Sequence, residues 1–349
     1  MQPHDELPEF PAVAVTFAAR TVQRWCGATA LLLAVAGSVP SPVAADRMQV
    51  TETPSPGRWT LAEGDRPVLV YNHGTIQPPD GFLEKVAPGN LKYAKPRSDY
   101  IHPLYGLDGQ ELTHDWSLDH PHHRGIYWAW PEVMLGEEMG DLHALQRVFA
   151  RPVGTPVTRT KEAFAEIEAR SRWMWEDTIP IVEETARIRV WRLRLEDMEP
   201  VRRIDLEFHF RALTNNVTVA RRETRLYGGL NCRFASNAGQ ELTTYIAPEG
   251  SDPRPAWASL TGDFANKGSQ ILGIFQHPAN LDYPGDWVQY PELNWLQPTF
   301  PRAGTRFPLP TDKPLILRYR FSNYASHPHS TWDAEWNRYA NGSSDADLP

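Results

Sequence analysis

The residues with the most chemical potential lie in one short run, which reads Asp-His-Pro-His-His-Arg-Gly over residues 119–125. It holds three of the 12 histidines of the chain, together with a carboxylate and a guanidinium. Neutral histidine is a common metal ligand and transfers protons near neutral pH, and an adjacent carboxylate can orient an imidazole and fix its tautomer. Each histidine alone is better explained as a turn cap, but the cluster as a whole favours a functional site.

Three residues of this run, His120, His122 and His123, are therefore candidate catalytic acids or bases. The same three are candidate ligands of a divalent metal ion, which is the one cofactor that the sequence suggests. Arg124 offers a planar fork of donors for a carboxylate, a phosphate or sugar oxygens. Because Pro121 breaks any simple alternation, the sequence does not decide which of the three histidines face a cleft.

A second carboxylate would be needed for paired acid and base catalysis, and Glu223 is the candidate. It lies between a charged strand and a glycine turn, so an exposed, salt-bridged side chain is an equally good interpretation. His277 and Asn280 follow an apolar strand, where a loop cap explains them slightly better than a site does. The residues that we expect to contact a substrate are His102, Arg124, Trp128, Trp130, Tyr227, Arg233, His277 and Asn280.

The elements that must position these residues are strands. Runs such as 182–195 and 204–211 alternate apolar and charged residues with a period of two, which is typical of strands with one wet face. Pro and Gly separate about a dozen or more such runs, few helices are convincing, and no fixed-period repeat is present. The pattern predicts an all-β chain, an antiparallel β-sandwich over residues 46–322. A polar tail is expected over 323–349, with one candidate short helix around Trp332 and Trp336.

The composition excludes several classes of protein. The net charge of −8 over 349 residues, with no basic run interleaved with aromatic residues, argues against a nucleic-acid partner. No G-x-S-x-G, P-loop, H-E-x-x-H or G-x-G-x-x-G motif is present, so serine hydrolases, ATPases, zincins and nicotinamide enzymes lose their usual support. The 13 Trp residues weakly favour a sugar as the ligand, because flat aromatic faces suit pyranose rings.

The first 45 residues have the order of a secretory signal. Arg20 and Arg24 precede an apolar core at 28–36, and small residues follow up to Ala45. We expect a periplasmic or secreted protein without stable membrane insertion after the signal is removed; an uncleaved signal that anchors the chain is the alternative. Removal of the signal would also remove Cys26 and leave Cys232 without an internal disulfide partner.

Several of these motifs together resemble the PmoA family of bacterial proteins. The resemblance rests on 102–105, 119–125 and 128–130, and on Tyr-Gly-Gly at 227–229 with Arg233, 274–280 and 315–320, and it spans roughly residues 60 to 322. It implies a β-sandwich of the galactose-mutarotase type and a setting among sugar-catabolic enzymes. The label "methane oxygenase" does not fit, because particulate methane oxygenase is an integral membrane enzyme and this chain has no membrane bundle. The tail after Tyr324 and the long N-terminal extension depart from the family's usual outline.

Three functions remain open at this point. The first is a carbohydrate-active enzyme that cleaves a glycosidic bond by hydrolysis or elimination, or epimerises a sugar, with histidine and carboxylate catalysis and metal assistance as an option. The second is an oxidoreductase in which the histidines, with Asp119 or Glu223, hold iron or copper. The third is a glycan-binding protein without catalysis, in which ligand binding would survive replacement of His122 and His123 by Ala.

Overall fold

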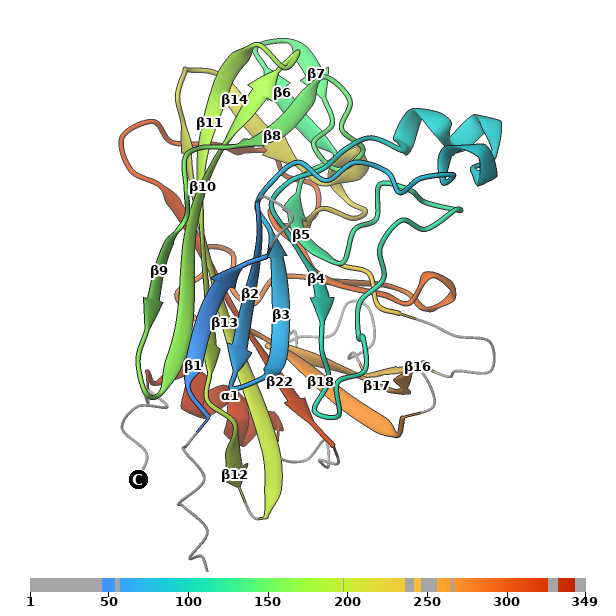
Figure 1. Cartoon of the computed structure of the whole chain (residues 1–349). Coiled ribbons are helices and arrows are strands. Elements are labelled where there is room, and N and C mark those ends of the chain that lie inside the picture. Colours follow the sequence, from blue (N-terminus) through green and yellow to red (C-terminus); the bar gives the residue numbers. More distant parts are fainter. Residues whose placement is uncertain are drawn as a thin grey trace, which may run out of the picture. The chain divides into compact units, whose positions relative to one another are not determined.

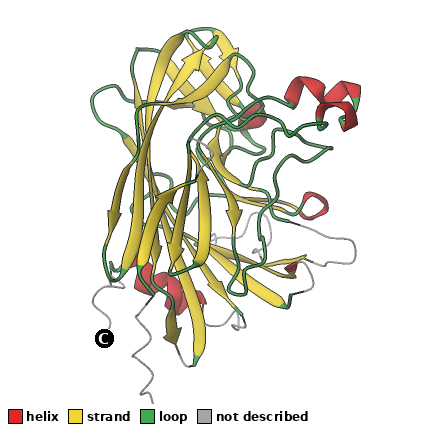
Figure 2. Cartoon of the chain, in the orientation of Figure 1, coloured by secondary structure: helices red, strands yellow, loops and turns green. Residues whose placement is uncertain are grey.

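The structure is a computed structural model that describes residues 46–53, 57–196, 198–235, 242–245, 256–264, 267–325 and 332–342. These residues belong to one unit, Ala45–Pro349. Regular structure in them is almost entirely β, and every ladder between named strands is antiparallel (Figure 1, Figure 2). The predicted all-β class is confirmed.

One layer is a ten-stranded sheet whose long central strands are those with the clearest alternation in the sequence. In the pairing of β11 with β13, Ile188 lies opposite Leu206, and both are buried, while the flanking Arg187 and Arg189 are partly exposed on the outer face. The strands are β8 (Val148–Pro152), β9 (Val157–Thr160), β10 (Phe164–Trp175), β11 (Ile179–Trp191), β12 (Arg194–Glu196), β13 (Glu199–Ala212), β16 (Leu242–Tyr245), β17 (Trp257–Asp263), β18 (Ser269–Gln276) and β22 (Leu315–Tyr324).

A six-stranded sheet forms the second layer and packs on the inner face of the first. The indole of Trp128 lies 5.5 Å from the ring of Phe208 and 5.3 Å from that of Phe210, centroid to centroid. Such contacts between β5 and β13 close one shared core, so the predicted antiparallel sandwich is confirmed. The strands are β1 (Met48–Glu52), β2 (Arg58–Glu63), β3 (Arg66–Asn72), β4 (Tyr100–Leu104), β5 (Ile126–Ala129) and β15 (Gly229–Cys232).

Shorter elements carry the loops of the candidate site. They form a four-stranded sheet, a two-stranded sheet and short 3-10 helices. They are β6 (Glu132–Leu135), β7 (Glu138–Gly140), β14 (Val217–Ala220), β21 (Phe307–Pro308), β19 (Trp287–Tyr290), β20 (Trp295–Pro298), η1 (Leu83–Lys85), η2 (Pro88–Tyr93), η3 (Arg222–Thr224) and η5 (Pro291–Leu293).

The segment expected as a polar tail contributes to the folded unit. Strand β22 runs to Tyr324, and the expected short helix is present as α1 (Trp332–Ala340). Trp332 is fully buried, with its ring 5.5 Å from that of Phe275, and Glu335 is fully buried against Arg203 of β13. A helix that looks polar in sequence therefore docks on the sheet, in part through a buried indole and a buried carboxylate. It lies at the opposite end of the view from η1 and η2 (Figure 1).

The predicted signal segment, residues 1–45, lies outside the described residues. Within the described part of the chain, no helix is long and apolar enough to cross a membrane.

Candidate functional site: a histidine-lined cavity

The histidine-rich run lies in the loop that joins β4 to β5, and its backbone is tightly held. Gly125 has a φ of +61°, and a Cβ atom there would lie 2.1 Å from the carbonyl oxygen of Ile101, so no other residue fits. The backbone N–H of His123 donates to the carbonyl oxygen of His120 at 2.9 Å, which closes a turn around Pro121. Proline and glycine thus fix the direction in which the loop presents its side chains.

Arg124 fastens this loop from inside. Its side chain is fully buried, donates to the carboxylate of Asp115 and to the hydroxyl of Tyr100, and stacks 3.4 Å from the ring centre of Trp116. A guanidinium with these partners holds the loop to β4. The structure therefore places Arg124, which we expected to contact a substrate, as a buried anchor of the loop that does not line the cavity described below.

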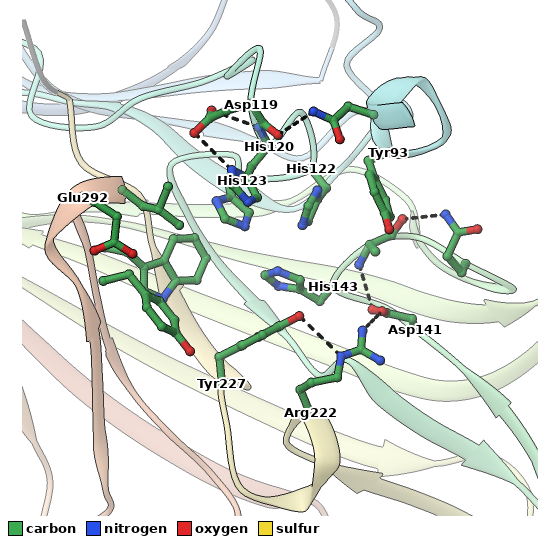
Figure 3. Close-up of a pocket in the computed structure, with 16 residues that line it drawn as sticks. Tyr93, Asp119, His120, His122, His123, Asp141, His143, Arg222, Tyr227 and Glu292 are labelled. Carbon is green, nitrogen blue, oxygen red and sulfur yellow. Dashed lines mark hydrogen bonds and ion pairs between the residues drawn. The ribbon is translucent and has the colours of Figure 1, made fainter. Parts of the chain in front are cut away.

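Three buried imidazoles meet beneath the loop. His122, His123 and His143 expose only 9%, 6% and 1% of their surface, and one ring nitrogen from each lies within 4.8 Å of the other two. His143 comes from the segment that follows β7, and it approaches the other two rings from the opposite side (Figure 3). Its Nδ1 lies 3.2 Å from the hydroxyl of Tyr127 on β5.

Burial keeps these imidazoles neutral. It lowers the pKa of His122 to about 3, and the nearby positive charge of Arg97 adds to the effect. Burial, and then the proximity of the other rings, also holds the pKa values of His123 and His143 well below the ordinary value. Near neutral pH each ring therefore has one nitrogen lone pair available as a ligand.

A metal ion could be held by His122, His123 and His143. The sequence suggested His120, His122 and His123, so the structure puts His143 where we expected His120. His120 does stack on His123, with 4.7 Å between ring centroids, but its Nδ1 is directed to Asp119.

His120 and Asp119 form a separate pair at the mouth of the cavity. The Nδ1 atom of His120 lies 3.1 Å from Oδ2 of Asp119, and the Asp119 carboxylate also accepts a hydrogen bond from Ser117 and lies 3.4 Å from a guanidinium nitrogen of Arg233. Burial by itself would raise the pKa of Asp119, but the hydrogen bonds from Ser117 and His120 and the charge of Arg233 hold it below its ordinary value. Asp119 is thus ionised at neutral pH and can orient His120.

Both clusters open on one cavity of about 600 Å³ (Figure 3). Four aromatic residues form part of its wall, and Trp295 is the most buried of them, with its ring 4.4 Å from that of His123. The aromatic lining residues are Tyr93, Tyr227, Tyr290 and Trp295, and the charged ones are Asp119, Asp141, Arg222 and Glu292. A mixed wall of this kind suits a ligand with both polar groups and C–H faces.

The far side of the cavity carries an ion pair. Arg222 donates to the carboxylate of Asp141 and lies 3.4 Å from the hydroxyl of Tyr227. Burial raises the pKa of Asp141, although hydrogen bonds from the backbone of Ala144 and from Arg222 oppose the rise. A carboxyl group with a raised pKa is suited to proton transfer.

Two predicted site residues lie elsewhere. The side chain of Glu223 is exposed on η3 and does not line the cavity, although its backbone N–H donates to Glu132. His102 lies on β4 at the edge of other surface hollows, where its Nδ1 is 3.0 Å from the hydroxyl of Thr113.

The predicted aromatic contacts and the second histidine loop also lie outside the cavity. Trp128 and Trp130 are core residues, and the indole N–H of Trp130 donates to a backbone carbonyl at 2.6 Å. The Asn280 side chain bonds both the N–H and the C=O of Arg318, and His277 Nδ1 accepts the N–H of Ala279, so both residues cap a loop. Of the expected substrate contacts, Tyr227 lines the cavity, and Arg233 supports it through Asp119.

Sequence reasoning missed eleven of the 16 residues that line the cavity, and five of these matter most to its chemistry. They are Tyr93, Asp141, His143, Arg222 and Trp295. Arg222 adjoins Glu223 in a run that did attract attention, and η3 turns the arginine inward instead of the glutamate. Asp141 and His143 carried a weak signal, an acid and an imidazole two residues apart just after a short strand, which is too common a pattern to single out.

The comparisons place the chain without naming an activity. Among curated proteins, none matches it. The family model described as "Family of unknown function (DUF6807)" matches residues 58–336, a span that includes both histidine clusters and every residue lining the cavity. The chain therefore belongs to this family of unknown function, DUF6807.

Proposed function

We propose that the protein is a carbohydrate-active enzyme, which cleaves a glycosidic bond by hydrolysis or elimination, or epimerises a sugar. The observation that carries the proposal is the opening of the His120–Asp119 pair on a cavity walled by aromatic rings and carboxylates. A cavity of about 600 Å³ is the size that small ligands occupy. The resemblance to the PmoA family adds support, because that family often lies among sugar-catabolic enzymes.

In this proposal His120 is the first proton-transfer group. Asp119 engages Nδ1, which leaves Nε2 of His120 free to accept or donate a proton at a bound hydroxyl or glycosidic oxygen. Ser117 and Arg233 hold Asp119 in place. In such an arrangement the base, here His120, is oriented by a neighbouring group, here Asp119.

Asp141 takes the role that the sequence suggested for Glu223. It lines the cavity, and its raised pKa favours a carboxyl group that can give up or take a proton. Hydrolysis, elimination and epimerisation all need an acid and a base in position together. Arg222, bonded to Asp141, would bind a substrate oxygen on which negative charge develops.

The aromatic wall supplies the affinity for a sugar ring. Trp295 and Tyr93 flank the imidazoles, with the Tyr93 ring 5.0 Å from that of His122. A pyranose lying on such faces would direct its hydroxyls to Glu292, Asp141 and Arg222. A divalent ion in the imidazole cluster would add Lewis-acid polarisation of a substrate oxygen.

The imidazole cluster also favours a second candidate, a metal-dependent oxidoreductase. Imidazole ligands suit iron and copper as well as zinc. Metal analysis of the purified protein separates the two functions, because an oxidoreductase of this kind must contain stoichiometric iron or copper.

We propose export to the periplasm or beyond as the setting, on the strength of the sequence of residues 1–45. Cell fractionation, with detection of the protein in each fraction, tests this part of the proposal. An uncleaved segment would leave the protein attached to the membrane fraction.

The test of the enzyme proposal is a substrate screen. Plant and algal oligosaccharides, including 3-keto derivatives, are incubated with the full-length chain with and without added divalent metal, and new reducing ends, unsaturated products and epimers are measured. We expect turnover that His120→Ala lowers by about 10²–10⁴-fold and that His209→Ala, a change on the outer face of β13, leaves intact. Ligand binding without turnover would instead indicate a glycan-binding protein, and a His120→Ala variant with wild-type turnover would contradict the assigned base.

A further inference from the structure

We propose that His122, His123 and His143 form a three-imidazole centre for one divalent transition-metal ion of the zinc class. The inference concerns a ligand set that the sequence did not identify, because His143 joins two neighbours of the histidine-rich loop. It goes beyond the proposed function, since it specifies an ion and its ligands whatever the substrate proves to be.

The geometry of the three rings suits such an ion. Zinc–nitrogen bonds of about 2.0–2.1 Å in a tetrahedral site put the ligand nitrogens about 3.4 Å apart. The three nitrogens already lie within 4.8 Å of one another, on rings whose centroids are 4.5 to 5.4 Å apart. Small rotations of the side chains therefore bring all three onto one ion.

The rings also lack partners that a purely structural role would provide. Among the described residues, the buried Nδ1 atoms of His120, His122 and His123 have no hydrogen-bond partner, although Nδ1 of His120 lies at ion-pair distance, 3.1 Å, from a carboxylate oxygen of Asp119. A buried polar atom without a partner costs about 1–3 kcal/mol. The rings of His122 and His123 are adjacent and at least nine-tenths buried, and a metal ion would satisfy imidazole lone pairs directly.

The surroundings of His143 complete the ligand set. Its Nδ1 lies 3.2 Å from the Tyr127 hydroxyl, which leaves Nε2 as the ligand atom and fixes the orientation of the ring. Arg97 is buried, stacks 4.3 Å from the ring centre of Tyr127, and donates to the backbone carbonyls of Leu142 and His143. The segment after β7 is therefore held where His143 faces the loop.

The donor set selects the class of ion. Three neutral imidazoles with no carboxylate in the set suit zinc and its transition-metal neighbours, whereas Mg²⁺ and Ca²⁺ require oxygen ligands. Neutral ligands leave the full charge on the ion, and the carboxylates of Asp119 and Asp141 line the same cavity and offset it. Three protein ligands beside an open cavity are the arrangement of a catalytic centre with a free coordination position.

The experiment measures metal binding in the full-length chain, independently of turnover. The protein is stripped with a chelator, equilibrated with Zn²⁺ or Co²⁺, and examined by elemental analysis, by competition with a chromophoric chelator, and by the visible spectrum of the Co²⁺ form. We expect one ion per chain, cobalt bands of a four-coordinate nitrogen-rich site, and no displacement by Mg²⁺ or Ca²⁺.

Two variants decide the ligand set. His143→Ala should lower zinc affinity by more than about 100-fold, the upper range for loss of an outer partner. His120→Ala should leave zinc affinity unchanged, although its ring stacks on His123. If His143→Ala fails to fold, as judged by circular dichroism, His122→Ala serves in its place. The proposal is overturned if the stripped wild-type chain takes up no zinc or cobalt, or if His120→Ala loses the ion while His143→Ala keeps it.

Discussion

Two buried polar clusters in this protein differ in whether their polar atoms have hydrogen-bond partners within the protein. Between β13 and α1, Glu335 is fully buried and accepts from Nε of Arg203 at 2.6 Å and from Nη2 at 2.7 Å. The hydroxyls of Ser322 and Tyr324 also donate to that carboxylate. Each oxygen of Glu335 is thus satisfied by the protein itself.

The imidazole cluster of His122, His123 and His143 is also buried, yet the Nδ1 atoms of His122 and His123 lack a hydrogen-bond partner among the described residues. This difference distinguishes buried polar groups that stabilise the fold from those that can bind a ligand. A buried cluster whose hydrogen bonds are all internal is expected to stabilise the fold, whereas ring nitrogens without a partner beside a cavity are available to a ligand. Substitutions in the first should therefore cost stability, and substitutions in the second should cost binding or activity.

The largest effect should come from Arg203→Met. It leaves Glu335 as a buried charge without its main partner, and we expect a loss of about 3–5 kcal/mol in the free energy of unfolding. Denaturant unfolding measures it. Arg338→Met is the matched control, because Arg338 bonds the same carboxylate from a position that is 39% exposed, and it should cost about 0–1 kcal/mol. Equal losses in the free energy of unfolding from Arg203→Met and Arg338→Met would show that the buried ion pair contributes no more than the exposed one.

A comparable effect, on turnover instead of stability, is expected from His120→Ala. Loss of a positioned acid or base lowers kcat by about 10²–10⁴-fold, and unfolding should be nearly unchanged because the side chain is 40% exposed. Steady-state kinetics on the substrate found by the screen, with thermal unfolding alongside, measure both. A parallel loss of stability would show that His120 supports the fold as Glu335 does.

The third effect in size should be a loss of stability at low pH through Glu335, the buried carboxyl group of α1. Burial alone would raise the pKa of Glu335, but the hydrogen bonds and charge of Arg203 hold it below the ordinary value of 4.5. A carboxyl group with a depressed folded pKa contributes stability that is present above the unfolded pKa and is lost as pH falls through the folded pKa. The stability gap between wild type and Glu335→Gln, followed by denaturant titration from neutral pH downward, should narrow below about pH 4.5. A gap that is constant with pH would show that this ionisation is not linked to folding.

A smaller effect is expected from Tyr127→Phe. It removes the hydroxyl that lies beside Nδ1 of His143 and keeps the ring. Zinc affinity should fall about 10–100-fold, as measured by competition with a chelator. Unaltered affinity would mean that Tyr127 does not orient the ligand.

The smallest effect should be that of His122→Leu on the stability of the metal-stripped protein. An apolar side chain of similar size removes a buried nitrogen without a partner, so the free energy of unfolding should stay within about 1 kcal/mol of wild type or rise. Unfolding in the presence of a chelator measures it. A loss near that of Arg203→Met would mean that this imidazole has a structural role after all.

Much of the sandwich could be predicted because period-two alternation is a local signal. Ile188 and Leu206 each sit in such runs, and they face each other across β11 and β13. The aromatic strand β5 misled us on function, because all four of its residues are buried, and nothing in a short apolar run says that both faces are covered. Trp128 therefore looked available to a sugar and is core.

The site was predictable only as far as it is contiguous in sequence. His122 and His123 belong to one loop, whereas His143 reaches them through tertiary packing of the segment after β7. Glu223 and Arg222 are neighbours whose directions depend on the turn of η3, where Glu223 has a φ of 52°. Glu335 belongs to the segment expected as a polar tail, and its burial could not be predicted because its partner Arg203 lies 132 positions earlier in the chain.

The origin of His143 on a separate segment has a consequence for how the molecule is tied together. Cys232 is the one cysteine of the described residues, so the part of the chain around the cavity has no covalent cross-link of its own. A metal ion bound by both the β4–β5 loop and the segment after β7 would form a reversible cross-link between them. At a free concentration 100 times its dissociation constant, such a ligand stabilises the folded state by about 2.7 kcal/mol. The free concentration of that ion would then affect the temperature at which the protein unfolds and its lifetime against proteases.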